Sequence, residues 1–170
     1  MKITVLNGSP RPNGNTAGMV KTFREAAETA GHTVTVFEVC KMNVKGCMAC
    51  EYCHERGQGE CIQKDDMKEI YKSLQDTDML ILASPIYYHN MSAQLKCVID
   101  RFYSVLYPKA PGSLKKVAMF LSSGDPDMYE GARFSYEGDF LGYLGLEDGG
   151  IYTNHDRNVL ERISEMAARL

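Results

Sequence analysis

Four cysteines fall within fifteen residues, and they are the side chains of this chain with the plainest chemical potential. They are Cys47, Cys50, Cys53 and Cys61, and their spacing is C-x2-C-x2-C-x7-C. Two-residue gaps let successive sulfurs face one point, and glycines in the longer gap allow the chain to return with the fourth. Crowded thiolates repel one another and oxidise unless a cation joins them. The spacing therefore indicates a metal ion or an iron-sulfur cluster.

Composition narrows the class of protein around this cysteine segment. The chain has 170 residues and a net charge of -3, with acidic and basic residues interspersed. A length of this order suits one domain, residues 1–170, and the charge pattern argues against nucleic acid and anionic membrane surfaces. The longest apolar stretch, residues 79–83, is far short of the roughly 20 that cross a bilayer, and the first residues lack a signal-peptide pattern. We expect a cytoplasmic protein with a small-molecule partner.

The remaining two of the six cysteines lie outside the segment. In an intracellular chain with an ordinary apolar core, clustered cysteines bind metal or take part in redox chemistry more often than they form disulfides. Cys40 and Cys97 are expected to be small buried hydrophobes. His54 follows the third cysteine and is expected to be solvated rather than a ligand.

Hydrophobic periodicity predicts strands that alternate with helices. The expected strands are residues 3–6, 33–39, 79–83, 117–121 and, weakly, 150–153. The expected helices are residues 16–30, 66–74, 91–102, 129–141 and 158–170, the second opened by a capping box of Asp66 and Glu69. This order predicts a doubly wound parallel α/β sheet with a cysteine-rich loop at residues 47–61. Such sheets bind ligands beyond the carboxyl ends of their strands.

The loop after the first strand, residues 8–16, carries groups that suit a phosphate monoester. It is neither a Walker A motif nor G-x-G-x-x-G. It offers the Ser9 and Thr16 hydroxyls, the Arg11 cation and the Asn15 amide beside the start of a helix, where backbone N–H groups favour an anion. A loop that only caps its helix is the plainer alternative, but it explains one hydroxyl rather than the set.

The loops after the third and fourth strands suit a flat aromatic ligand. Residues 84–90 place Ile and Tyr where a loop is ordinarily polar, and residues 122–124 add small groups opposite. A phosphate at one end and a planar ring at the other describe FMN. No protein acid or base stands out as catalytic. Flavin N5 would carry the hydride, and the protein would supply position and electrostatics. Tyr88 and His89 are candidates to protonate a bound quinone, although packing roles explain them equally well.

Several motifs together resemble the NAD(P)H-dependent FMN reductase superfamily of flavodoxin-like proteins. They are Gly8-Ser-Pro-Arg-Pro-Asn-Gly-Asn-Thr16, Ser84-Pro-Ile-Tyr-Tyr88, Ser92-Ala-Gln-Leu-Lys96 and Asp100-Arg101. The cysteine segment followed by Asp65-Asp66-Met67 resembles the iron-sulfur flavoprotein branch. The resemblance covers residues 1 to about 125.

The resemblance implies a flavodoxin-like fold with strand order 2-1-3-4-5 and a homodimer or homotetramer with FMN near a subunit interface. It implies that the FMN phosphate lies on Ser9, Arg11, Asn15 and Thr16. The residues implied to line the isoalloxazine are Pro85, Ile86, Tyr87, Tyr88, Ser123 and Gly124.

These inferences predict an FMN-dependent oxidoreductase that exchanges electrons between FMN and a [4Fe-4S] cluster on the four cysteines. The cysteine loop leaves the second strand, which predicts a separation of about 10 Å from the third strand at the same sheet edge. The expected partners are redox small molecules or an electron carrier such as ferredoxin, with NAD(P)H as a further donor. The alternatives are an NAD(P)H-dependent quinone, nitro or azo reductase without a cluster, cysteines that hold zinc or nothing, and a non-catalytic binding module.

Overall fold

The computed structural model describes all residues, 1–170, and has a parallel five-stranded sheet at its centre. The strand order is β2-β1-β3-β5-β6, and a two-residue strand, β4, pairs antiparallel with β3. The strands are β1 Lys2–Asn7, β2 Thr33–Glu38, β3 Met79–Tyr87, β4 Asn90–Met91, β5 Lys116–Ser122 and β6 Glu147–Thr153. The predicted flavodoxin-like order is confirmed, with β5 and β6 as the fourth and fifth predicted strands.

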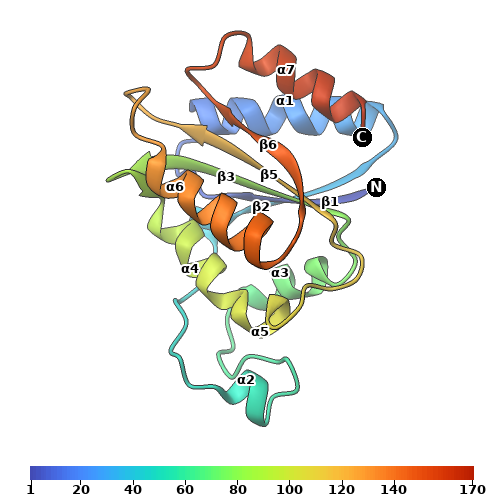
Figure 1. Ribbon diagram of the computed structural model, residues 1–170, viewed down its shortest axis with the longest axis vertical. Coiled ribbons are helices and arrows are strands. Elements are labelled where there is room, and N and C mark those ends of the chain that lie inside the picture. The colour runs from blue at the N-terminus through green and yellow to red at the C-terminus, as the bar shows by residue number, and fades with distance from the viewer.

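The centre of the sheet is apolar because helices cover both of its faces. Residues 79–83 of β3 are fully buried, and β3 pairs in parallel with β1 on one side and β5 on the other. Continuous apolar runs are typical of such doubly covered strands. Helices α1, Asn15–Thr29, and α7, Val159–Ala168, lie together on one face (Figure 1).

The other face carries α3, Met67–Leu74, α4, Ala93–Arg101, and α6, Glu130–Ser135 (Figure 1). Each face has its own buried apolar cluster, centred on Phe23 and Ile163 under α1 and α7, and on Leu74 and Leu95 under α3 and α4. The sheet thus forms the middle layer of three. Strands β1, β3 and β5 run parallel and end at the same carboxyl edge of the sheet.

Two predicted elements differ from the structure. Strand β3 does not end at Ser84 but continues to Tyr87, because residues 86 and 87 pair with β4 in a hairpin. The predicted helix 129–141 is α6 followed by a π-helix, η2, over Tyr136–Tyr143. The buried Tyr136 hydroxyl donates to the Val117 carbonyl oxygen and to Asp148, which anchors this wider turn to the sheet.

The predicted capping box at α3 is wrong. The Asp66 side chain caps nothing in its own helix and instead accepts a hydrogen bond of 2.7 Å from the backbone N–H of Asn43. The neighbouring Asp65 contacts the first turn of α3 instead, because its Oδ1 accepts a hydrogen bond of 3.3 Å from the Met67 N–H. Both aspartates therefore connect α3 to the segment that precedes the cysteines.

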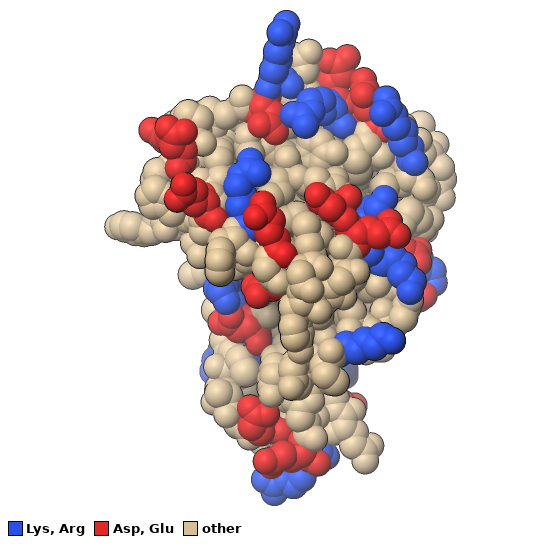
Figure 2. Space-filling view, viewed as in Figure 1, with Lys and Arg blue, Asp and Glu red and all other residues tan.

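The cysteine segment projects from the lower end of the molecule, beyond α5, Tyr103–Leu106 (Figure 1). It follows η1, Val39–Lys41, and contains one short helix, α2, Tyr52–Glu55. Figure 2 shows acidic and basic side chains interspersed over the visible face, with no broad area of one sign. None of the helices combines the length and the apolar character that crossing a membrane requires.

Candidate functional site at the carboxyl edge and the cysteine segment

The β1–α1 loop places its predicted phosphate-binding residues at the carboxyl edge of the sheet. Ser9 and Thr16 are buried, whereas Arg11 and Asn15 are exposed. Thr16 Oγ1 lies 2.7 Å from Ser122 Oγ at the end of β5, so the first and third predicted loops meet. The β1–α1 loop and the loop after β5 therefore lie side by side at the carboxyl edge.

The start of α1 presents unused hydrogen-bond donors. Its N-cap residue, Gly14, has no side chain to cap the helix, and the backbone N–H groups of residues 15–17 donate to no protein atom. Such N–H groups, with the positive end of the helix dipole, form a ready anion site. The donors present fit the phosphate of FMN.

Gly8 and Ser92 connect this loop to α4. The Ser92 hydroxyl donates to the Gly8 carbonyl oxygen at 2.9 Å, and its Oγ caps α4 by accepting from the Leu95 N–H at 3.4 Å. A Cβ on Gly8 would lie 2.6 Å from Ser92 Oγ and 2.8 Å from Leu95 Cβ. Only glycine lets the loop approach α4 this closely.

The β3–β4 hairpin holds the residues predicted to line a flavin ring. Tyr88 and His89 form its turn with φ of 51° and 63°, the conformation of a type I′ turn. Tyr88 is 99% exposed, whereas Ile86 is 9% exposed. The Tyr88 side chain therefore projects into solvent from the turn of a hairpin, whereas Ile86 packs into the core.

The third predicted loop is anchored by Asn154 and Tyr129, for which the sequence predicted no role. The Ser123 N–H donates to Asn154 Oδ1 at 2.8 Å, and the Asn154 amide donates back to the Ser123 carbonyl oxygen at 3.1 Å. The Tyr129 hydroxyl also donates to Asn154 Oδ1. Gly124 faces open space. The position of Asn154 directly after the last strand could have indicated this role, because that strand ends at the same edge of the sheet.

The four cysteines border one cavity at the cysteine segment. Cys53 is buried, Cys61 is half-buried, and Cys47 and Cys50 are exposed, all as free thiols. Burial raises the pKa of the Cys53 thiol, and the neighbouring Cys61 and Cys47 raise it further. Cys61 and Cys47 thus lie close enough to disfavour the ionisation of Cys53, as expected where a cation is needed to stabilise thiolates.

Four thiols are suitable ligands for an iron-sulfur cluster or zinc, but the cavity is too small to hold a cluster. The cavity measures only about 20 Å³, and no three of the chain's His, Cys, Asp and Glu side chains are arranged as metal ligands. A cluster would require more space and a closer arrangement of the cysteines than the structure has. His54 does not face the cavity as a ligand. Its ring packs on Tyr103 at 4.5 Å between centroids, and Nε2 lies 2.8 Å from the Tyr103 carbonyl oxygen.

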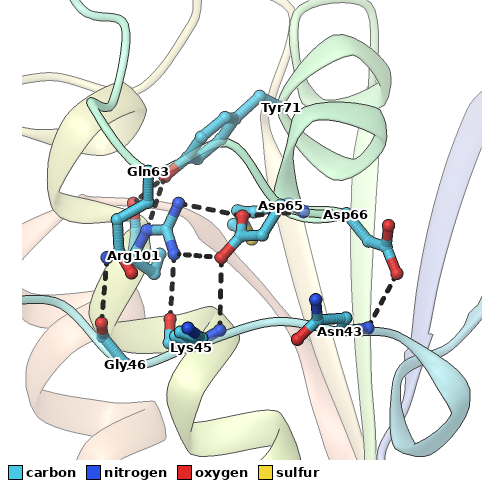
Figure 3. Close-up of polar contacts among 9 residues, drawn as sticks. Asn43, Lys45, Gly46, Gln63, Asp65, Asp66, Tyr71 and Arg101 are labelled. Atoms are coloured by element: carbon cyan, nitrogen blue, oxygen red, sulfur yellow. Dashed lines mark hydrogen bonds and ion pairs between the residues drawn. The ribbon is translucent and has the colours of Figure 1, made fainter.

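A buried ion pair connects both ends of the cysteine segment to α4 (Figure 3). Arg101 is 2% exposed, and its guanidinium donates to both carboxylate oxygens of Asp65, at 2.8 and 3.1 Å, and to the Lys45 carbonyl oxygen. Asp65 also accepts from the Lys45 N–H, and the Gln63 amide donates to the Gly46 carbonyl oxygen. Residues before and after the cysteines are thereby fixed side by side.

Arg101 also borders the cysteine cavity. Burial alone would lower the pKa of Arg101, but the hydrogen bonds to Asp65, together with Tyr71 and Cys61, raise the pKa overall, so the guanidinium stays charged. A second support comes from Tyr103, whose hydroxyl donates to Glu51 at 2.9 Å, and this hydrogen bond raises the pKa of Tyr103 to about 12. Arg101 therefore places a fixed positive charge at the border of the cysteine cavity.

Backbone strain concentrates at the two predicted sites. Six residues other than glycine have positive φ: Ala49, Glu51, Gln58, Tyr88, His89 and Asn158. Three lie in the cysteine segment and two in the β3–β4 hairpin. Such conformations cost free energy and persist where the surroundings hold them, most often at functional sites.

The two-strand separation predicted between β2 and β3 is confirmed, but the cysteine cavity does not lie beside the carboxyl-edge loops of the same chain. The cysteine cavity borders Arg101 at the end of α4, whereas the carboxyl-edge loops contact Ser92 at its start. Nine residues of helix separate these ends by about 14 Å. The segment leaves the carboxyl edge after β2 and extends beyond α5 instead of staying beside β2 (Figure 1).

The fold and the carboxyl-edge loops define a flavodoxin-like α/β protein. The model of the family described as NADPH-dependent FMN reductase matches residues 1–137. The chain belongs to this family, and this membership supports FMN as its cofactor.

Curated relatives carry the name iron-sulfur flavoprotein. One from Methanosarcina thermophila is 41% identical over 126 residues, which cover 73% of this chain and 63% of that protein. One from Archaeoglobus fulgidus is 38% identical over 101 residues, 59% of this chain and 45% of that protein. The aligned part of the chain thus spans about half to two thirds of their length. An NAD(P)H:quinone oxidoreductase from Methanothermobacter marburgensis shares the fold, with a TM-score of 0.75, 22% identity and coverage of 99% and 93%.

Proposed function

We propose that the protein is an FMN-dependent oxidoreductase in which the carboxyl edge holds FMN and Cys47, Cys50, Cys53 and Cys61 hold a [4Fe-4S] cluster. The observation that carries the cluster is the convergence of all four cysteines on one cavity that a buried guanidinium borders. When bound, FMN would supply hydride chemistry and the cluster would supply single-electron chemistry. The names of the iron-sulfur flavoproteins support the pairing.

The chain's own groups would act by binding and positioning. The free N–H groups at the start of α1, with Ser9, Arg11, Asn15 and Thr16, would bind the phosphate. The hairpin residues 85–88 and Ser123 with Gly124 would border the ring. Because the cavity and this edge lie at opposite ends of α4, we propose a homodimer or homotetramer that brings one subunit's cysteines near another's FMN.

The donors and acceptors are also part of the proposal. We propose redox small molecules or a carrier protein such as ferredoxin as partners, with NAD(P)H as a further donor and a cytoplasmic location. The second candidate function is an FMN-containing quinone, nitro or azo reductase without a cluster. The small volume of the cysteine cavity favours this second function, because the four cysteines are not arranged as metal ligands.

Replacing all four cysteines by serine separates the two functions. The variant and the wild type are purified without oxygen, and FMN, iron and acid-labile sulfide are measured, followed by turnover with NADPH and a quinone or a one-electron dye. Our proposal predicts that the variant keeps FMN, loses iron and sulfide, and transfers electrons to the dye at least about tenfold more slowly. Cys97→Ser, which changes a half-buried cysteine outside the segment, is the control. Undiminished turnover with both acceptors would establish the reductase without a cluster.

A further inference from the structure

A second, larger cavity lies on the outer side of Cys61. It measures about 720 Å³ and shares four bordering residues with the cysteine cavity: Cys61, Gln63, Tyr71 and Ser104. Its volume falls within the roughly 300–1,000 Å³ of small-molecule sites. The fourth cysteine thus forms part of the wall between the small cysteine cavity and the larger one.

Three lysines give this outer cavity a positive charge. Lys68 and Lys72 lie one turn apart on α3, and Lys64 precedes them by the same spacing. None of the three forms a salt bridge. Of the acidic residues at the cavity, Asp65 is already neutralised by Arg101, which leaves Glu60 alone. Like charges one turn apart destabilise a helix, so their grouping brings α3 no local benefit.

A buried donor without a partner faces the same space. Ser104 is 6% exposed, and its Oγ is the one buried side-chain oxygen or nitrogen of the chain that has no hydrogen-bond partner. It lies near the Tyr71 hydroxyl and helps to offset the burial that raises the pKa of Tyr71. The Tyr71 hydroxyl hydrogen, however, is given to the Arg101 carbonyl oxygen at 3.0 Å. No protein atom lies in hydrogen-bonding geometry with Ser104 Oγ, and its hydroxyl hydrogen can rotate toward the cavity, where a ligand would satisfy it.

The geometry points to a binding site for a small polyanion, phosphate or carboxylate in chemistry, held by Lys64, Lys68, Lys72 and the Ser104 hydroxyl against the outer side of Cys61. Ammonium groups bind anionic oxygens by charge, and a hydroxyl donor fixes their orientation. Only one consequence rests on the proposed function: an anionic redox substrate bound here would lie next to the fourth cysteine. The anion site itself stands without it.

Calorimetric titration with inorganic pyrophosphate tests the site. The protein is loaded with FMN first, so that the phosphate site at α1 is filled, and the flavin absorbance reports this occupancy. At low ionic strength we expect saturable binding that weakens about tenfold in the double variant Lys68→Gln/Lys72→Gln, because two charged contacts are lost. Ser104→Ala is expected to weaken binding several-fold, and circular dichroism checks that each variant folds.

Lys21→Gln is the control, since Lys21 is an exposed lysine on α1, across the sheet. It should leave the affinity unchanged. No saturable binding at millimolar pyrophosphate, or equal weakening by Lys21→Gln, would overturn the site, and an unchanged affinity in Ser104→Ala would overturn the buried contact. If FMN fails to bind, the proposed function fails, whereas the titration still reports on the lysines.

Discussion

Among the substitutions considered for stability, replacement of Arg101 is expected to lower the free energy of unfolding most. Replacing it with glutamine leaves the Asp65 carboxylate buried without its cation. Breaking one partner of a buried ion pair costs about 3–5 kcal/mol, so we expect Arg101→Gln to lower the free energy of unfolding by that amount. Urea denaturation measures this.

The matched control is Lys96→Gln, because Lys96 pairs with Asp100 on the exposed side of the same helix. An exposed pair contributes about 0–1 kcal/mol. If Arg101→Gln cost no more than Lys96→Gln, the ion pair would not anchor the cysteine segment.

The Asp65 carboxylate gives the molecule an acid-sensitive contribution to stability. Burial alone would raise the pKa of Asp65, but Arg101 and the backbone N–H groups of Lys45 and Met67 lower it below the usual value of 3.8. A lowered pKa adds stability above that value, and the contribution disappears as pH falls through the folded-state pKa. The difference in unfolding free energy between wild type and Asp65→Asn should therefore shrink from about pH 5 to about pH 2. A difference that is constant over this range would contradict the assignment.

At the scale of elements, the close contact between the β1–α1 loop and α4 depends on Gly8. A methyl group there would lie 2.6 Å from Ser92 Oγ, so Gly8→Ala must separate the loop from α4. Overpacking of this kind costs about 1–3 kcal/mol, and we also expect weaker FMN binding because the phosphate loop shifts.

Gly18→Ala is the control for this prediction. Gly18 lies inside α1, and a Cβ there meets nothing within 4 Å. The change should stabilise the protein by about 1 kcal/mol, since alanine is the better helix former. In thermal unfolding, Gly8→Ala should lower the Tm and Gly18→Ala should raise it. A change of the same sign in both variants would contradict the role of Gly8.

The strands and most helices could be predicted because local patterns decide them. The apolar run of residues 79–83 and the helical spacing around Phe23 specify burial directly. The β3–β4 hairpin and the π-helix could not be predicted, because Tyr88 and His89 at positive φ and the buried Tyr136 hydrogen bonds depend on tertiary contacts. The false capping box has the same cause, since Asp66 is used by Asn43 instead.

At the scale of the whole molecule, topology brought the three carboxyl-edge loops together as predicted. The contact between Thr16 and Ser122 joins segments 106 residues apart. The cysteine segment was misplaced, because nothing local to it shows that Arg101 and Tyr103 anchor it at the far end of α4. Its distance from the carboxyl edge in one chain makes oligomeric state part of any functional account.

The central claim is that one chain holds both FMN and a [4Fe-4S] cluster. The most direct measurement is the visible spectrum of protein purified without oxygen, with quantitation of FMN, iron and acid-labile sulfide. The account predicts flavin absorbance superimposed on broad cluster absorbance, with about one FMN, about four iron atoms and about four sulfides per chain. Flavin with neither iron nor sulfide would contradict the cluster, and the absence of flavin would contradict the account as a whole.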